Sequence, residues 1–188
     1  MDRPERRVAH STPDPRPRPL AGLSTVICAG CGAEVADIAG PTHAYMSSAP
    51  GCWNAYGVLL ARSRDWIVDR GTVQLRTDSY ASQHATNPDP RNRQSVAMHL
   101  MSLCATLEFG LAPGSTTALL GRWTHRPGGY PDLISDVPHG IVTVVDVLSV
   151  DDGDAHALAV ADWARSVWNG WSDHHDEIRL LLAEYGLR

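Results

Sequence analysis

Apolar residues recur every three or four positions along most of this 188-residue chain, which is the spacing of one face of an α-helix. Trp53, Tyr56, Leu59 and Leu60 show the pattern after Pro50, a residue that suits the first turn of a helix. Later helices are bounded by Asn-Pro, glycine or proline signals. The pattern predicts helices over residues 50–68, 75–85, 94–109, 115–125, 154–169 and 173–185.

The segments between these helices carry different signals. We expect Gly71 to interrupt the helical pattern between the first two helices, and residues 126–140 to form a loop. Residues 24–28 fit a short extended segment, whereas the continuous apolar run at 143–150 fits either a short helix or a strand. Because strands are nearly absent, the chain is predicted to be an all-α protein, built as a helical bundle.

Composition indicates one globular domain, with a hydrophobic content of 43%. Residues 1–22 are rich in proline and charge, so we expect a disordered tail before a single domain over residues 23–188. A formal charge of -5 argues against nucleic acid as a partner, because phosphate binding needs clustered basic residues. The sequence has no apolar run of about 20 residues and no apolar signal region at its start, so we expect a cytoplasmic protein without a membrane segment.

The turn Cys28-Ala-Gly-Cys31 contains two thiols three positions apart. Zn²⁺ prefers such sulfur ligands when two more donors arrive from elsewhere, although two cysteines at this spacing can also be incidental. In a reducing compartment, cysteines are more often metal ligands or buried thiols than disulfides. The turn is therefore predicted to form a zinc knuckle, whereas Cys104 lies in an apolar helix and is expected to be an inert buried thiol.

Cys52 and His84 are the expected partners of this turn. Cys52 opens the first predicted helix, where the helix dipole favours a thiolate, and His84 closes the second. A short connection around Gly71 would pack these helices antiparallel and bring both residues together. His43 competes with His84 for the fourth ligand position. The predicted zinc site, packed on the first helical hairpin, consists of Cys28, Cys31, Cys52 and His84.

A second group of histidines lies on helix faces that we expect to point inward, at His99, His156, His174 and His175. Converging imidazoles could hold a catalytic metal or act as general acid and base near pH 7. We therefore take His99, His174 and His175 as candidate catalytic residues that line a pocket for a small-molecule ligand. The alternative is that each histidine is an ordinary core residue with its own hydrogen-bond partner.

Five longer motifs are distinctive: Cys28-x-x-Cys31-Gly-Ala, Ser48-Ala-Pro-Gly-Cys52-Trp53, Asp78-Ser-Tyr80-Ala-Ser-Gln83-His84, Gln94-Ser-Val-Ala-Met-His99-Leu100, and the stretch from Trp163 through Trp168 and Trp171 to His175. Over roughly residues 25–185 they resemble DUF5946, a family of uncharacterised bacterial proteins. The chain has Ala85 where the family's Gln-His is followed by proline, and Val73 where the family often has histidine. The resemblance implies no activity, but all four predicted ligands match the family pattern.

Two classes of function are open. The first is a zinc-binding helical protein in which zinc is mainly structural and the inward histidines line a small-molecule pocket. The second is a small zinc-dependent enzyme of metabolism or natural-product tailoring, in which zinc or the inward histidines activate water or a carbonyl. A zinc ion with four protein ligands favours the first class, because catalysis by zinc needs an open coordination position.

Overall fold

The computed structural model describes residues 24–62, 70–124, 129–135 and 139–187, and these are predominantly helical, as predicted. The predicted disordered tail, residues 1–22, lies outside the described residues. Strands β1 (Thr25–Ile27) and β2 (Glu34–Ala36) form an antiparallel pair with Val26 opposite Val35. The helices are α1 (Pro50–Arg62), α2 (Arg70–Gln83), α3 (Pro90–Leu107), α4 (Pro113–Trp123), α5 (Val144–Leu148), α6 (Gly153–Gly170) and α7 (His175–Ala183), with a 3₁₀ turn at Ser172–His174. No helix in the described ranges is long and apolar enough to cross a membrane.

Local capping chemistry explains where the observed helices differ from the expected ones. Gly71 was expected to separate the first two helices, but it lies in the first turn of α2. α3 begins four residues earlier than predicted, because Pro90 occupies its first turn and Asp89 accepts a hydrogen bond from the backbone N–H of Arg91. The ambiguous run at 143–150 contains the helix α5, whose start is fixed by reciprocal hydrogen bonds between Thr143 and Asp146.

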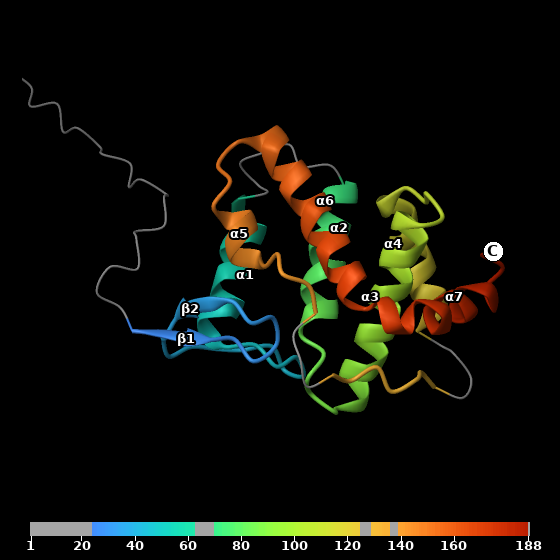
Figure 1. The fold of residues 1–188 in the computed structure, drawn as a ribbon, viewed down its shortest axis with the longest axis horizontal. Coiled ribbons are helices and arrows are strands. Elements are labelled where there is room, and N and C mark those ends of the chain that lie inside the picture. The colour runs from blue at the N-terminus through green and yellow to red at the C-terminus, as the bar shows by residue number, and fades with distance from the viewer. Residues whose placement is uncertain (1–23, 63–69, 125–128, 136–138, 188) are drawn as a thin grey trace, which may run out of the picture.

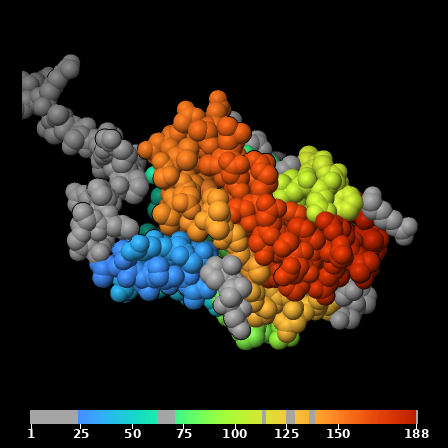
Figure 2. Space-filling view, viewed as in Figure 1, coloured from blue at the N-terminus to red at the C-terminus, as the bar shows by residue number. Residues whose placement is uncertain are grey.

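Helix α2 occupies the middle of the fold and packs against α3, α4 and α6 (Figure 1). On the face shown in Figure 2, the surface is formed largely by α5, α6 and α7. α7 packs on α3, and Arg179 binds the carboxylate of Glu108 through both its Nε and Nη2 atoms. The sequence of α2 is polar, yet most of its side chains are buried; these include Thr72, Gln74, Arg76, Asp78, Ser79, Tyr80, Ser82 and Gln83.

Side-chain contacts show that α1 and α2 run antiparallel, as the sequence suggested. Near the start of α1, Cys52 lies beside Tyr80, with 3.7 Å between the sulfur and the hydroxyl oxygen. One turn later, the hydroxyl of Tyr56 donates to Thr77 over 3.3 Å. Farther along α1, the Leu59 carbonyl accepts from Arg76. Residues later in α1 therefore contact residues earlier in α2, which is the arrangement of antiparallel helices.

The segment 139–142 joins α2 to α6 through close backbone packing. The side-chain amide of Gln83 donates to the carbonyls of His139 and Val142, and its oxygen accepts from the indole N–H of Trp163. Gly140 has a φ of 81°, a conformation that favours glycine, and its backbone nitrogen lies directly against Gly170. These contacts leave no space for a side chain at position 170.

We predict that Gly170→Ala destabilises the fold by about 1–3 kcal/mol, because the new methyl group overlaps the backbone of Gly140. Gly121→Ala is the control: its methyl group meets no atom within 4 Å, and alanine favours the helix by up to about 1 kcal/mol. Urea unfolding of both variants measures the difference. Equal stability of the two variants would show that α6 does not need this close approach.

Candidate metal centre

The turn between β1 and β2 positions the first two cysteines. The backbone N–H of Cys28 donates to Ala33 over 2.9 Å, and the N–H of Gly32 donates back to the Cys28 carbonyl over 2.8 Å. Gly32 has a φ of 75°, in the left-handed region where glycine is unstrained. The turn buries the side chains of Cys28 and Cys31.

The other two residues of the centre come from helix ends. Cys52 lies in the first turn of α1, and His84 directly follows the last residue of α2. The start of α1 is held against β2, because the backbone of Gly51 touches the Ala36 carbonyl so closely that no Cβ fits there. The antiparallel packing of α1 and α2 then brings both side chains, fully buried, to the turn that carries Cys28 and Cys31.

The spacing of the four ligand atoms fits a tetrahedral metal ion. The three sulfur atoms and a ring nitrogen of His84 all lie within 4.8 Å of one another. Three of the six edges measure 3.7 Å (Cys31 to Cys52, Sγ to Sγ), 3.6 Å (Cys28 Sγ to His84 Nε2) and 3.4 Å (Cys52 Sγ to His84 Nε2). Zinc bonds of about 2.3 Å to sulfur and about 2.0 Å to nitrogen give tetrahedral edges of about 3.8 and 3.5 Å. The donor set and its size therefore fit a tetrahedral metal ion.

The groups around the ligands orient them for metal binding. The His84 Nδ1 atom lies 2.7 Å from the Tyr80 carbonyl, which can only accept, so Nδ1 carries the hydrogen and Nε2 is available as a ligand. The Tyr80 ring stacks on the His84 ring at a centroid distance of 4.0 Å. The backbone N–H of Ala49 donates to the Cys28 sulfur over 3.4 Å, which stabilises negative charge there.

The electrostatics of the cluster favour a thiolate. Hydrogen bonds from Cys31 and Cys52 lower the pKa of the Cys28 thiol far below its usual range, against the opposing effect of burial. The hydrogen bond with Cys28 raises the pKa of the Cys52 thiol. Burial alone lowers the pKa of His84, but its hydrogen bonds to Cys28 and Cys31 outweigh that effect and raise the pKa to about 9. Since metal ligands must be deprotonated, binding a metal here would release protons from the cluster.

His43, which the sequence left as an alternative to His84 for the fourth ligand, lies outside the cluster. Its Nδ1 atom is 3.5 Å from the backbone N–H of Tyr45, and its ring packs edge-on against Tyr45 and Trp53. Cys104 is also separate, as expected: it is fully buried, and its pKa is raised to about 12, first by burial and then by Glu108. Within the described ranges, no other group of three or more Cys, His, Asp or Glu residues is close enough to hold a metal.

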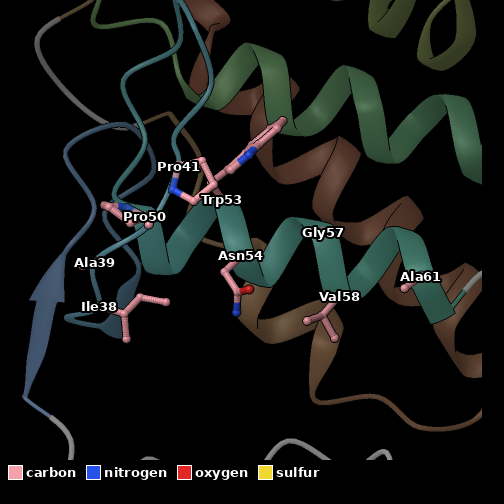
Figure 3. A pocket seen from close by; sticks show the side chains of 10 residues that line it. Ile38, Ala39, Pro41, Pro50, Trp53, Asn54, Gly57, Val58 and Ala61 are labelled. Carbon is pink, nitrogen blue, oxygen red and sulfur yellow. The ribbon is translucent and has the colours of Figure 1, made fainter.

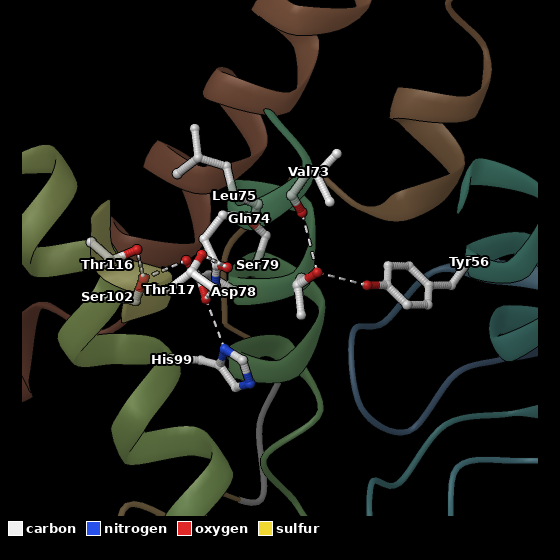
Figure 4. Close-up of polar contacts among 11 residues, drawn as sticks. Tyr56, Val73, Gln74, Leu75, Asp78, Ser79, His99, Ser102, Thr116 and Thr117 are labelled. Carbon is white, nitrogen blue, oxygen red and sulfur yellow. Dashed lines mark hydrogen bonds and ion pairs between the residues drawn. The ribbon is translucent and has the colours of Figure 1, made fainter. Parts of the chain in front are cut away.

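A second polar cluster surrounds Asp78, which is fully buried in α2 (Figure 4). Its carboxylate accepts hydrogen bonds from Gln74 Nε2 at 2.7 Å, from His99 Nδ1 at 2.7 Å and from the Ser102 hydroxyl at 2.6 Å. The last two residues belong to α3, so the carboxylate joins the two helices. Of the candidate catalytic residues, only His99 is oriented by a buried carboxylate. Asp78 was missed as a site residue, although it opens one of the five distinctive motifs and lies in a row of polar residues, Gln74, Asp78 and Ser82, at helical spacing.

The other histidines lie on different elements and have different neighbours. The His175 ring stacks on Trp168 at 3.8 Å and lies 2.9 Å from that residue's carbonyl oxygen. His174 was expected to point inward, but its side chain is 39% exposed beside Glu177, because it closes the short 3₁₀ turn that precedes α7. His156 is buried in α6, and burial lowers its pKa, with the charges of Arg76 and Arg62 acting in the same direction.

The chain belongs to DUF5946, described as a family of unknown function, because residues 26–172 match this family. This match confirms the resemblance seen in the sequence and includes all four residues of the metal centre. α7 follows the matched region. No curated protein and no solved structure matches the chain.

Gly30 gives a test of the centre that changes no ligand. A Cβ at this position would overlap the His84 ring and the Ser47 carbonyl, so we predict that Gly30→Ala displaces His84 and lowers the metal content of the purified protein. Gly40→Ala is the matched control, since its nearest neighbour, Pro50, is 3.9 Å from the new methyl group. Elemental analysis of both proteins checks the prediction. Full metal content in Gly30→Ala would mean that His84 is not held where the turn places it.

Proposed function

We propose that this chain is a zinc-binding helical protein in which the zinc ion is structural. The observation that carries the proposal is the set of tetrahedral edge distances among three buried cysteine sulfurs and one histidine nitrogen. Three thiolates and an imidazole are soft donors that select zinc over magnesium or calcium, which prefer oxygen. The ion would tie the turn after β1 to the start of α1 and the end of α2.

The donor count supports a structural ion over a catalytic one. Four protein ligands fill a tetrahedral site, so no position is left for water or substrate. All four ligand residues are buried, with Cys31 the most exposed at 3%. The neighbouring hydroxyl of Tyr80 points at Cys52, and burial raises its pKa, which leaves it a poor proton donor. These features suit an ion that holds chain segments together.

A small enzyme is the second candidate, and one observation favours it. The bond from His99 Nδ1 to the buried Asp78 carboxylate leaves Nε2 as the ring nitrogen that can accept a proton. The His99 side chain is 17% exposed, so its ring is not sealed from solvent. Such a pair can act as a general base, but a buried carboxylate with three hydrogen bonds also serves as an ordinary link between helices. We therefore rank the enzyme proposal second.

Removal of one ligand tests the structural role. We predict about one zinc per chain in the wild-type protein, and in Cys31→Ser both loss of zinc and a fall in the melting temperature of roughly 10 °C, since a few kcal/mol of ligation energy corresponds to about 2–4 °C per kcal/mol at this chain length. Cys104→Ser is the control, because it changes another buried thiol outside the cluster. The proposal fails if the wild-type protein, purified under reducing conditions, contains no stoichiometric metal.

Cobalt substitution separates a structural site from a catalytic one. We expect the visible spectrum of the Co²⁺ protein to show tetrahedral coordination and to stay unchanged when azide or cyanide is added, because four protein ligands leave no open position. The same titration on Co²⁺-loaded His84→Ala is the control, in which a vacated position should let the anion bind and shift the spectrum. An anion-dependent spectrum in the wild-type protein would favour the enzyme.

A further inference from the structure

The outer face of α1 carries an apolar groove. A cavity of ≈ 400 Å³ lies between α1 and the segment that follows β2, and Figure 3 shows the side chains that line it. Trp53, Gly57 and Ala61 line the groove from α1, four residues apart along the helix, and Ile38 and Pro41 line it from the segment that follows β2. No histidine lines it, so this cavity is separate from the pocket expected at the inward histidines.

The described part of the chain begins at Ser24, beside this groove. The carbonyl of Ser24 accepts a hydrogen bond from the backbone N–H of Asp37 over 2.8 Å. Ile38, the next residue after Asp37, already lines the groove. Ser24 is therefore hydrogen-bonded to the residue that directly precedes the groove residue Ile38. The segment before Ser24 is joined to the chain at this point.

The sequence before Ser24 has the chemistry that such a groove binds. Proline occurs at every second position in Pro13-Asp-Pro15-Arg-Pro17-Arg-Pro19. A chain of this composition favours the polyproline II conformation, which needs no internal hydrogen bonds and docks on grooves lined by aromatic side chains. Trp53 supplies the aromatic wall, and Pro41 and Pro50 add rigid apolar rings.

The proline-rich stretch is long enough to span the groove. Ser24 is five positions after Pro19, so an extended connection between them reaches about 16 Å. From Pro13 to Pro19, a polyproline II helix rises about 19 Å, at about 3.1 Å per residue. The wall of α1 from Trp53 to Ala61 is about 12 Å long, at 1.5 Å per residue. The proline-rich stretch can therefore cover the whole groove.

Charge also favours this occupant. Residues 1–22 contain five of the 16 basic residues of the chain but only three of its 21 acidic ones, so the segment is positive and the remainder is negative. Glu34 and Asp37 are exposed on the hairpin, where the segment leaves it. Arg16 and Arg18 alternate with the prolines and can approach these carboxylates while the prolines face Trp53.

We propose that the groove on α1 binds the proline-rich stretch 13–19 of the same chain. Tethering gives the stretch an effective concentration of about a millimolar, so a weak contact is enough to keep the groove filled. The groove would then recognise alternate proline rings on Trp53, with the arginines toward Glu34 and Asp37.

Two full-length variants test the proposal by NMR of ¹⁵N-labelled protein. In the first, serine replaces Pro13, Pro15, Pro17 and Pro19, so the length and charge of the segment are kept. In the second, Gly57→Leu fills the groove; a Cβ at Gly57 meets no atom within 4 Å, and leucine favours a helix, so the variant should melt at or above the wild-type temperature. Gly121→Leu is the matched control, since a Cβ at this helical glycine also has open space.

We expect the serine variant to shift the amide signals of residues 38–41 and 53–61, and Gly57→Leu to shift those of Arg16 and Arg18, while Gly121→Leu leaves both sets in place. The shifts should not depend on protein concentration. The proposal is overturned if the serine variant leaves the signals of the groove residues in place and Gly57→Leu leaves those of Arg16 and Arg18 in place. It is also overturned if the shifts grow with concentration, because the segment then binds a second copy of the chain.

Discussion

The fold depends on burying a polar helix. α2 lies between α3, α4 and α6, yet its sequence is polar, so each buried donor and acceptor needs a partner. Several of these groups find partners on neighbouring elements: Arg76 donates to α1, Asp78 accepts from α3, and Gln83 binds both the segment 139–142 and α6. An unsatisfied buried polar group costs about 1–3 kcal/mol, so these bonds fix the position of α2 as well as stabilise it.

The metal centre inherits its geometry from this helix. His84 directly follows α2, and its Nδ1 atom binds the carbonyl of Tyr80, one turn earlier. The rings of Tyr56, Tyr80 and His84 stack in succession at 4.0 Å, which places the start of α1 and the end of α2 together. A shift of α2 along its axis would therefore move Nε2 away from the three sulfurs.

The sequence predicted the parts of this structure that depend on local chemistry. Pro50 marked the start of α1, and cysteines at a turn and a helix start, with a histidine at a helix end, identified the cluster that the structure brings together. The central role of α2 could not be predicted in this way, because hydrophobic periodicity assigns polar residues such as Asp78 to the surface. Their burial is set by partners such as His99 and Trp163, which are distant in sequence.

The packing of the β1–β2 hairpin on α1 links the metal centre to the outer surface of α1. Strands of three residues are too short to be stable alone, and the β1–β2 hairpin packs on α1 through contacts such as that of Gly51 with Ala36. Cys52 faces inward from the first turn of α1, while Trp53 and Asn54, the next residues, line the groove. An ion held by Cys28, Cys31, Cys52 and His84 would thus fix both walls of the groove, because one wall follows β2 and the other is α1 itself.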